Sequence, residues 1–204
     1  MIKAIKHKTT IDNVTSILIF IGYAIPGFVF ALLLLVWFAG QYDLFPLGGF
    51  VSDDFQDLNA LEKVWDVIHH AVLPLAGYMV GSFAVMTMMT KNSLMDHLSA
   101  DYVRTAMAKG LTFKSAVLKH ALRNSLIPIA THFGNNISLI LTGSLLIEQI
   151  FDIDGFGLLG FESVVERDYP VVMGILAISA LLQLVGNIIS DICVAVVDPR
   201  VQFN

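Results

Sequence analysis

The sequence predicts an all-α membrane protein in which about four helices cross the bilayer. Hydrophobic residues make up 56% of the 204 residues and charged residues only 14%, and the mean hydropathy is +0.74. These values are too apolar for an ordinary water-soluble domain. The apolar residues collect in four long stretches, and six of the twelve Lys and Arg lie between the second and third of them. We therefore expect a single membrane domain over residues 1–204.

Each of the four apolar stretches is long enough to cross a bilayer as a helix. About 20 residues at ~1.5 Å per residue span the ~30 Å of hydrocarbon. The stretches cover about residues 14–39, 69–90, 125–147 and 170–197. Pro26 and Gly27 predict a kink near the middle of the first span. Gly77 and Gly81 predict that a neighbouring helix approaches the second span closely.

The distribution of positive charge predicts on which side of the membrane each connection lies. Ten of the twelve Lys and Arg precede the first span, lie between the second and third spans, or follow the fourth span. They are Lys3, Lys6, Lys8, Lys91, Arg104, Lys109, Lys114, Lys119, Arg123 and Arg200. Since Lys and Arg are enriched on the cytoplasmic side, we expect both termini and the central segment to be cytoplasmic. The acidic connections at residues 43–66 and 148–170 are then outside.

The two outer connections differ in composition. Residues 43–66 contain scattered acidic residues, Pro46 and two glycines, which is typical of a solvated loop, followed by a short helical stretch at about 61–68. In residues 148–170, glycines alternate with bulky apolar residues. We expect this second connection to be more than a simple loop: it either folds back against the mouth of the bundle or forms a short re-entrant helix, as a compact gate-like structure on the outer side.

The polar segment between the second and third spans predicts a helix, a glycine break and a second helix over about residues 93–122. Four residues that recur every fourth position, Leu94, Leu98, Tyr102 and Ala106, share one helical face. Gly110 suits a left-handed C-cap, and Thr112 suits the N-cap of the next helix. On that second helix Phe113, Val117 and either His120 or Ala121 share a face. Taken alone, the pattern fits either a docking element for a partner protein or a helix lying on lipid head groups.

Three motifs resemble one transporter family. They are DYVRTAMAKGL with HALRNSLIP, then GSLLIEQIFDIDGFGLLGFESVVERDYPVV, and finally DPR at residues 198–200, in that order along the chain. The sequence from about Tyr102 to its end is similar to the permeases of binding-protein-dependent ABC transporters of the dipeptide, oligopeptide and nickel branch. Within that branch it is most similar to the microcin C and oligopeptide type of inner-membrane permease.

The resemblance implies an ABC permease fold of type I and the function of a membrane-spanning subunit of a peptide importer in the cell inner membrane. The implied partners are a second permease subunit, two cytoplasmic ABC ATPase subunits, an extracytoplasmic solute-binding protein and the lipid bilayer. Related permeases have about six spans. We therefore expect this chain to correspond to the C-terminal part of a permease, without two N-terminal spans.

The resemblance also assigns the central helix pair to coupling with the ATPase. The implied coupling residues are Asp101, Tyr102, Arg104, Thr105, Ala106, Lys109 and Gly110. Small side chains there let backbones approach closely, and basic side chains can pair with acidic residues on the partner. A short rigid helix of this kind can convert closure of an ATPase into tilting of the spans that flank it.

Polar residues inside the third span are candidates for the translocation path. Asn135, Asn136 and Ser138 lie close together there, and polar groups at membrane depth face other helices or a water-filled cavity. Two interpretations stay open for them: they line the path, or they form interhelical hydrogen bonds that hold the bundle together.

The sequence does not favour an enzyme. It contains no GxxxxGK[ST] phosphate-binding loop, so we expect ATP hydrolysis in a partner subunit. No nucleophile with its base and no cluster at metal-ligand spacing is evident, so we expect neither a catalytic site, a metal nor a cofactor. The net charge of −5 argues against nucleic acid as a partner. The alternative functions are a structural or channel-like membrane subunit that does not transport, and an inactive permease fragment.

Overall fold

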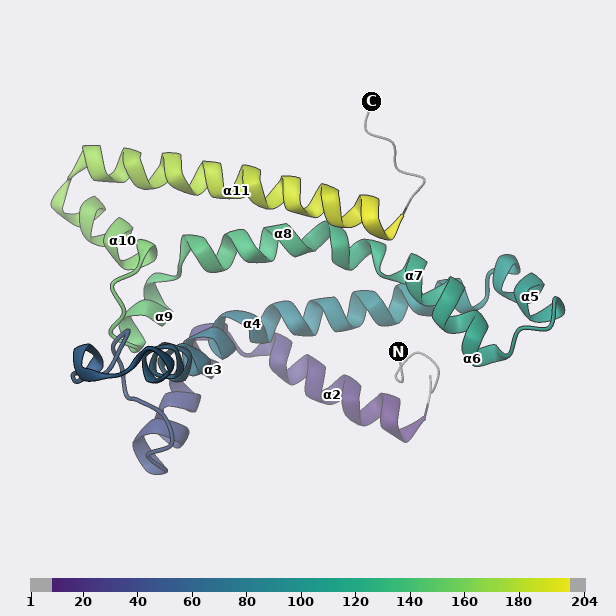
Figure 1. Ribbon diagram of the computed structural model, residues 1–204, viewed down its shortest axis with the longest axis horizontal. Coiled ribbons are helices and arrows are strands. Elements are labelled where there is room, and N and C mark those ends of the chain that lie inside the picture. The colour runs from purple at the N-terminus through teal and green to yellow at the C-terminus, as the bar shows by residue number, and fades with distance from the viewer. Residues whose placement is uncertain (1–8, 199–204) are drawn as a thin grey trace. The chain divides into compact units, whose positions relative to one another are not determined.

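The computed structural model describes residues 9–198, except for the side chains of Ile11, Asn135 and Ile140, and within that range every regular element is helical (Figure 1). The chain divides into two compact units. The first unit comprises Met1–Gly22, Phe83–Ser138 and Gln183–Asn204, and the second comprises Tyr23–Ser82 and Leu139–Leu182. We describe each unit by itself.

The helices follow the predicted order along the chain. Their bounds are α2 (Thr10–Ala24), α3 (Gly27–Leu34), the π-helix η1 (Leu35–Gln41), the 3-10 helix η2 (Phe55–Asp57), α4 (Ala60–Leu98), α5 (Asp101–Ala108), α6 (Phe113–Ala116), the π-helix η3 (Val117–Ala121), α7 (Leu122–Ser125), α8 (Ile127–Thr142), α9 (Leu145–Ile150), α10 (Phe156–Glu166) and α11 (Tyr169–Val197).

Two of the described helices, α4 and α11, are each long and apolar enough to cross a membrane. A third span results if α2 and the segment Gly27–Gln41, which are bent at a short break, count as one. That break is where Pro26 precedes α3, so the kink predicted in the first span is confirmed. The fourth predicted span coincides with α11, whereas the second is longer than predicted because α4 runs from Ala60 to Leu98.

The third predicted span, 125–147, is wrong at its C-terminal end. Helix α8 stops at Thr142 after 16 residues, or ~24 Å, because Gly143 adopts a left-handed backbone conformation with φ +83°. Ser144 is extended, and α9 starts a new helix at Leu145. The prediction for residues 148–170 is confirmed in that the segment is helical rather than a simple loop, since it contains α10.

The core of the second unit joins α3 and η1 to α4 and α9. Its buried apolar residues are Ala31, Ala39, Leu73, Ile147 and Phe151. Helices α3 and α4 approach so closely that a Cβ atom on Gly77 would lie 2.6 Å from the Cβ of Ala31. The close approach predicted at Gly77 is confirmed, whereas in the described part of the chain no neighbour lies within 4 Å of a Cβ position on Gly81.

In the first unit, α8 packs against α11 through small residues, and the two helices lie side by side in Figure 1. The N–H of Gly134 donates to Oγ of Ser190 at 2.9 Å. A Cβ on Gly134 would lie 1.6 Å from the carbonyl oxygen of Gly186, so only glycine fits at this crossing. This contact fixes α11 beside the helix that leads away from the polar central segment.

Candidate functional site

The central segment folds as a helical hairpin that follows α4, but not as the single first helix that the sequence predicts. Helix α4 ends at Leu98, and Ala100 is extended with ψ 145°, so α5 begins anew at Asp101. The break shifts the helical register. Tyr102 is therefore 38% exposed, and Val103, which the four-residue spacing did not select, is fully buried.

The turn at Gly110 follows the prediction. Gly110 has φ +94°, its N–H donates to the carbonyl of Met107 at 2.9 Å, and the N–H of Leu111 donates to the carbonyl of Ala106 at 3.2 Å. This pair of bonds is a Schellman motif, in which a glycine in the left-handed region satisfies the last carbonyls of a helix. Thr112 is the N-cap of α6, since its Oγ1 accepts from the N–H of Ser115 at 3.3 Å.

The buried face of the second helix differs in part from the prediction. Val117 and Ala121 are buried as expected, but Phe113 is 49% exposed and His120 is exposed. The π-helix η3 spans Val117–Ala121, and its wider turn changes which residues align along the helix. Ala116, the last residue of α6, is also completely buried.

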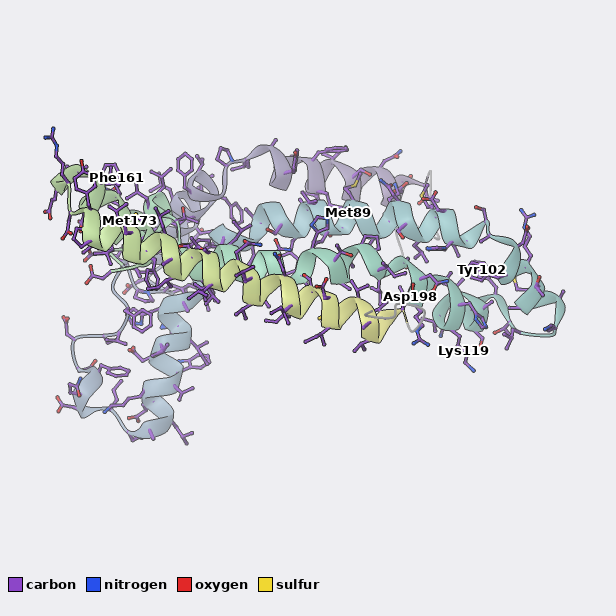
Figure 2. The ribbon with its side chains drawn as sticks, turned by 90° about the horizontal axis from the view of Figure 1, so that it is seen from above. Met89, Tyr102, Lys119, Phe161, Met173 and Asp198 are labelled. Atoms are coloured by element: carbon purple, nitrogen blue, oxygen red, sulfur yellow. The ribbon has the colours of Figure 1, made fainter. Side chains whose placement is uncertain are left out.

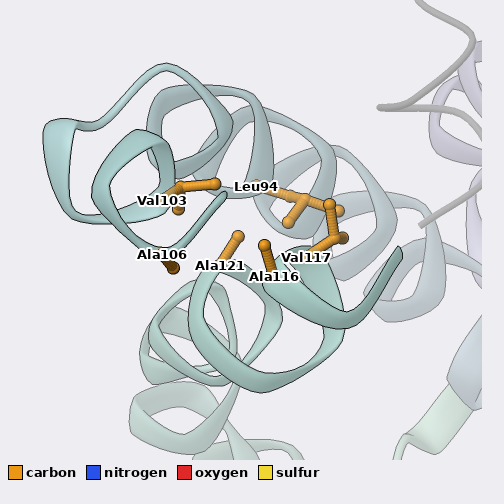
Figure 3. Close-up of a cluster of buried hydrophobic side chains, with 6 residues drawn as sticks. All are labelled: Leu94, Val103, Ala106, Ala116, Val117 and Ala121. Atoms are coloured by element: carbon orange, nitrogen blue, oxygen red, sulfur yellow. The ribbon is translucent and has the colours of Figure 1, made fainter. Parts of the chain in front are cut away.

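One apolar cluster holds the hairpin together. It consists of Leu94 from α4, Val103 and Ala106 from α5, and Ala116, Val117 and Ala121 from α6 and η3 (Figure 3). Leu94 is fully buried in it, so the two short helices rest on the last turns of α4. We call residues 101–121 the hairpin and these six residues its core.

Six of the seven predicted coupling residues lie on the surface of the hairpin. Asp101, Tyr102, Arg104, Thr105, Lys109 and Gly110 are exposed. Ala106 is the exception, because it is only 9% exposed and lies in the hairpin core. Its small side chain lets the helices of the hairpin itself approach one another. The exposed alanine on this surface is Ala108.

The charges on this surface interact locally and weakly. Nη1 of Arg104 lies 3.8 Å from a carboxylate oxygen of Asp101, and both side chains are largely exposed. Oη of Tyr102 and Nδ1 of His97 are hydrogen-bonded at 2.9 Å. Arg104 can readily exchange Asp101 for another partner, because an exposed ion pair contributes only ~0–1 kcal/mol to stability.

A basic pocket that the sequence did not predict lies beside the hairpin. Its volume is about 550 Å³, and its lining includes Tyr102, Lys119, Arg123 and Asp198. Figure 2 shows Tyr102, Lys119 and Asp198 at this end of the first unit. Nε of Arg123 donates to the carbonyl of Val197 at 3.0 Å, which attaches the last turn of α11 to α7. No local pattern relates residues 74 positions apart, so this bond could not be read from the sequence.

A buried ion pair joins α2 to α4. Nζ of Lys91 lies 2.8 Å and 3.0 Å from the two carboxylate oxygens of Asp12, and only 10% and 4% of the two side chains are exposed. The sequence offered one signal, because opposite charges stand at the predicted cytoplasmic ends of the first two spans. It did not identify them as partners.

The three candidate path residues lie in α8. The amide nitrogen of Asn136 donates to the carbonyl of His132 at 3.0 Å and lies 3.9 Å from the sulfur of Met86. Ser138 is buried, its hydroxyl donates to the carbonyl of Gly134, and a Cβ on Gly186 would meet its Oγ. The side chain of Asn135 is outside those that the structure describes. A role of these residues in translocation stays a prediction.

Comparison with known proteins relates the whole chain to one family. The family described as "Binding-protein-dependent transport system inner membrane component" matches residues 1–203. The chain is 47% identical to "Inner membrane ABC transporter permease protein YejB" of Escherichia coli O157:H7, over 98% of this chain and 56% of that protein. It is 39% identical to "Oligopeptide transport system permease protein AppB" of Bacillus subtilis, over 100% of this chain and 63% of that protein.

A third relative is "Dipeptide transport system permease protein DppB" of Bacillus subtilis, which is 35% identical over 100% of this chain and 61% of its own length. The chain thus spans less than two thirds of the length of these curated relatives. The family match extends over nearly every residue, including those that form the hairpin and the basic pocket. The chain therefore belongs to the family of binding-protein-dependent transport system inner membrane components.

Proposed function

We propose that this chain acts as a membrane-spanning subunit of an ABC importer, and that the hairpin is the element through which an ATPase subunit drives it. The observation that carries the proposal is the hairpin itself. It presents exposed small and charged side chains on a rigid apolar core, in a chain of a transport family. A protein partner can dock closely on Thr105 and Ala108 and can pair with Arg104 and Lys109.

The attachment of the hairpin suggests how it moves the membrane helices. It follows α4 and continues through α7 into α8. Its core includes Leu94 of α4, so a displacement of the hairpin carries the end of α4 with it. A rigid-body exchange between inward-open and outward-open states is the corresponding mechanism. In this proposal Ala106 does not contact the ATPase, and its small side chain in the hairpin core sets the distance between the hairpin helices.

The proposed assembly contains two ABC ATPase subunits, a second permease subunit and an extracytoplasmic solute-binding protein. Both termini and the hairpin are cytoplasmic in it, as the distribution of Lys and Arg supports. Residues 1–204 act as one membrane domain of the inner membrane. ATP is hydrolysed by the partner, since the sequence has no phosphate-binding loop.

Peptides are the proposed solutes. The support is the printed function of the relatives, of which one is an oligopeptide and one a dipeptide transport permease. In such an importer the polar residues Asn135, Asn136 and Ser138 of α8 are the proposed contacts along the path. The solute-binding protein selects the peptide before it reaches this chain.

A charged substitution on the hairpin surface tests the proposal. In the assembled importer, Ala108→Glu is expected to reduce both peptide uptake and the amount of ATPase subunit that copurifies by about tenfold or more, because a carboxylate then enters a close interface. The matched control is Ala60→Glu, which places the same side chain on an exposed alanine of α4 in the second unit. We expect the control to retain uptake and the ATPase subunit.

Wild-type copurification and wild-type uptake by the Ala108→Glu protein would contradict the proposal. Absence of peptide uptake by the unmodified importer, with the ATPase subunit still attached, would instead support the alternative of a structural subunit that does not transport. Membrane insertion is measured in parallel for each variant, so that loss of the protein is separated from loss of coupling.

A further inference from the structure

The buried ion pair between Asp12 and Lys91 lies close to the hairpin along α4. Lys91 precedes Leu94 by three residues, so the two side chains lie on neighbouring positions of the same helical face. Leu94 is fully buried in the hairpin core, and Lys91 is 9% exposed against α2. One turn of α4 therefore contacts the hairpin with one residue and α2 with another.

Stability alone does not account for this pair. Removing two charges from water costs free energy that their attraction offsets only where the geometry is good, and apolar replacements of buried pairs are often as stable. What a buried pair supplies in addition is a fixed geometry, since both carboxylate oxygens of Asp12 are within 3.0 Å of Nζ of Lys91. The exposed pair between Asp101 and Arg104, at 3.8 Å, has no such constraint.

The position of Asp12 within α2 adds to this constraint. Asp12 lies in the first turn of α2, where a negative charge interacts favourably with the helix dipole. Its carbonyl accepts hydrogen bonds from the hydroxyls of Thr15 and Ser16 at 3.2 Å and 2.7 Å. Asp12 is thus part of the hydrogen-bonded start of α2, and its short side chain connects Lys91 to this helix.

We infer that Asp12 and Lys91 are positioning residues that transmit movement of the hairpin to α2. This inference rests on the proposed function, because it requires an ATPase that moves the hairpin. Helix α2 then moves together with α4, although no residue of α2 belongs to the hairpin core. Because of the ion pair, the helices that move with the hairpin include α2, in addition to α4 and α8, which precede and follow the hairpin along the chain.

The test uses the complete importer in liposomes and measures the peptide imported for each ATP hydrolysed. The decisive variant is Asp12→Asn with Lys91→Met, since it removes both charges and leaves no unpaired charge buried. We expect it to assemble and to hydrolyse ATP, but to import about fivefold less peptide per ATP, a typical lower limit for coupling between two sites. The single variant Lys91→Arg, which keeps the positive charge beside Asp12, is expected to retain most of the wild-type yield of peptide per ATP. Asp96→Asn on exposed α4 surface is the control and is expected to be unaffected.

A wild-type yield of peptide per ATP in the doubly neutral variant would overturn the inference. If the unmodified importer itself imports no peptide, the proposed function is wrong instead.

A second measurement uses the protein with its ion pair intact. Spin labels at Asn13 on α2 and Lys114 on α6, in a Cys193→Ala background, are expected to keep one separation with and without nucleotide. A separation that changes with nucleotide would show that α2 moves independently of the hairpin, and the inference would be wrong.

Discussion

Glu148 is the polar side chain on which the connection between α8 and α10 depends. It is only 4% exposed, and its carboxylate accepts hydrogen bonds from the backbone N–H groups of Ser144, Gly157 and Leu158 at 3.0, 3.3 and 2.6 Å. The hydroxyl of Tyr78 on α4 donates to the same carboxylate at 3.4 Å. A Cβ on Gly155 would lie 2.3 Å from the carboxyl carbon, so glycine is required beside it.

Replacement of Glu148 tests this account at the residue scale. Glu148→Ala leaves three backbone N–H groups without an acceptor, and we expect a loss of at least ~3 kcal/mol in stability, since hydrogen bonds to a charged group are worth ~1.5–3 kcal/mol each. The measurement is denaturant unfolding of the purified protein in detergent. Glu162→Ala on exposed α10 is the matched control, and equal midpoints for the two variants would contradict the role of Glu148.

Individual site residues were predictable where their role depends only on the neighbouring residues in the sequence. Gly110 and Thr112 were identified because a left-handed C-cap and an N-cap need particular residue types. Ala106 shares its buried face with Leu94 as the four-residue spacing predicts, whereas the resemblance assigns it to the coupling surface; an alanine can serve a partner surface or an internal contact equally well. The partners of Lys91 and Arg123 were missed, because each lies more than 70 residues away and the sequence contains no distance information.

The hairpin is an element whose parts are too short to be stable alone. Helix α5 has 8 residues and α6 has 4, whereas isolated helices shorter than ~12 residues are marginal in water. Their stability therefore comes from the apolar core and from the turn at Gly110. Among the residues that the structure describes, no neighbouring atom lies within 4 Å of the position of a Cβ on Gly110, so a substitution there acts through backbone strain and not through a clash.

Gly110→Ala tests the turn at the element scale. A non-glycine residue in the left-handed region costs ~1 kcal/mol or more, so the amide protons of α5 are expected to exchange about fivefold faster. Gly174→Ala is the matched control, since Gly174 has the same open space within α11 but no positive φ. Unchanged exchange in α5 after Gly110→Ala would show that the hairpin core alone determines its stability.

The helices themselves were predicted well from hydropathy, and their ends less well. The fourth span agrees with α11 within one residue at its start. The sequence does not mark the end of α4, because alanine is a good helix former and yet Ala100 is extended. The end of α8 depends on contacts within the folded chain, because a Cβ on the left-handed Gly143 would meet Glu148 and Gly157. The carboxylate of Glu148, for example, binds the N–H of Ser144 directly after Gly143.

At the scale of the whole molecule, the apolar composition predicts that the helices lie in a membrane, because side chains that face lipid tails are apolar. Of the residues in α11, Gly186 and Ser190 are the buried ones. Large apolar side chains such as Leu181 (62%), Leu184 (58%) and Ile188 (58%) are exposed along it. A surface of this kind is stable against lipid tails or a second permease subunit, which agrees with the proposed inner-membrane assembly.

The central claim is that the hairpin touches the ATPase, and a photo-crosslinking amino acid at Ala108 tests it most directly in the assembled importer. We expect ultraviolet light to join this position to the ATPase subunit, and the same amino acid at Ala60 on α4 to leave that subunit unlinked. A protein that carries the crosslinker at Ala108, assembles normally and transports peptide, yet links only to lipid or to the solute-binding protein, would contradict the account.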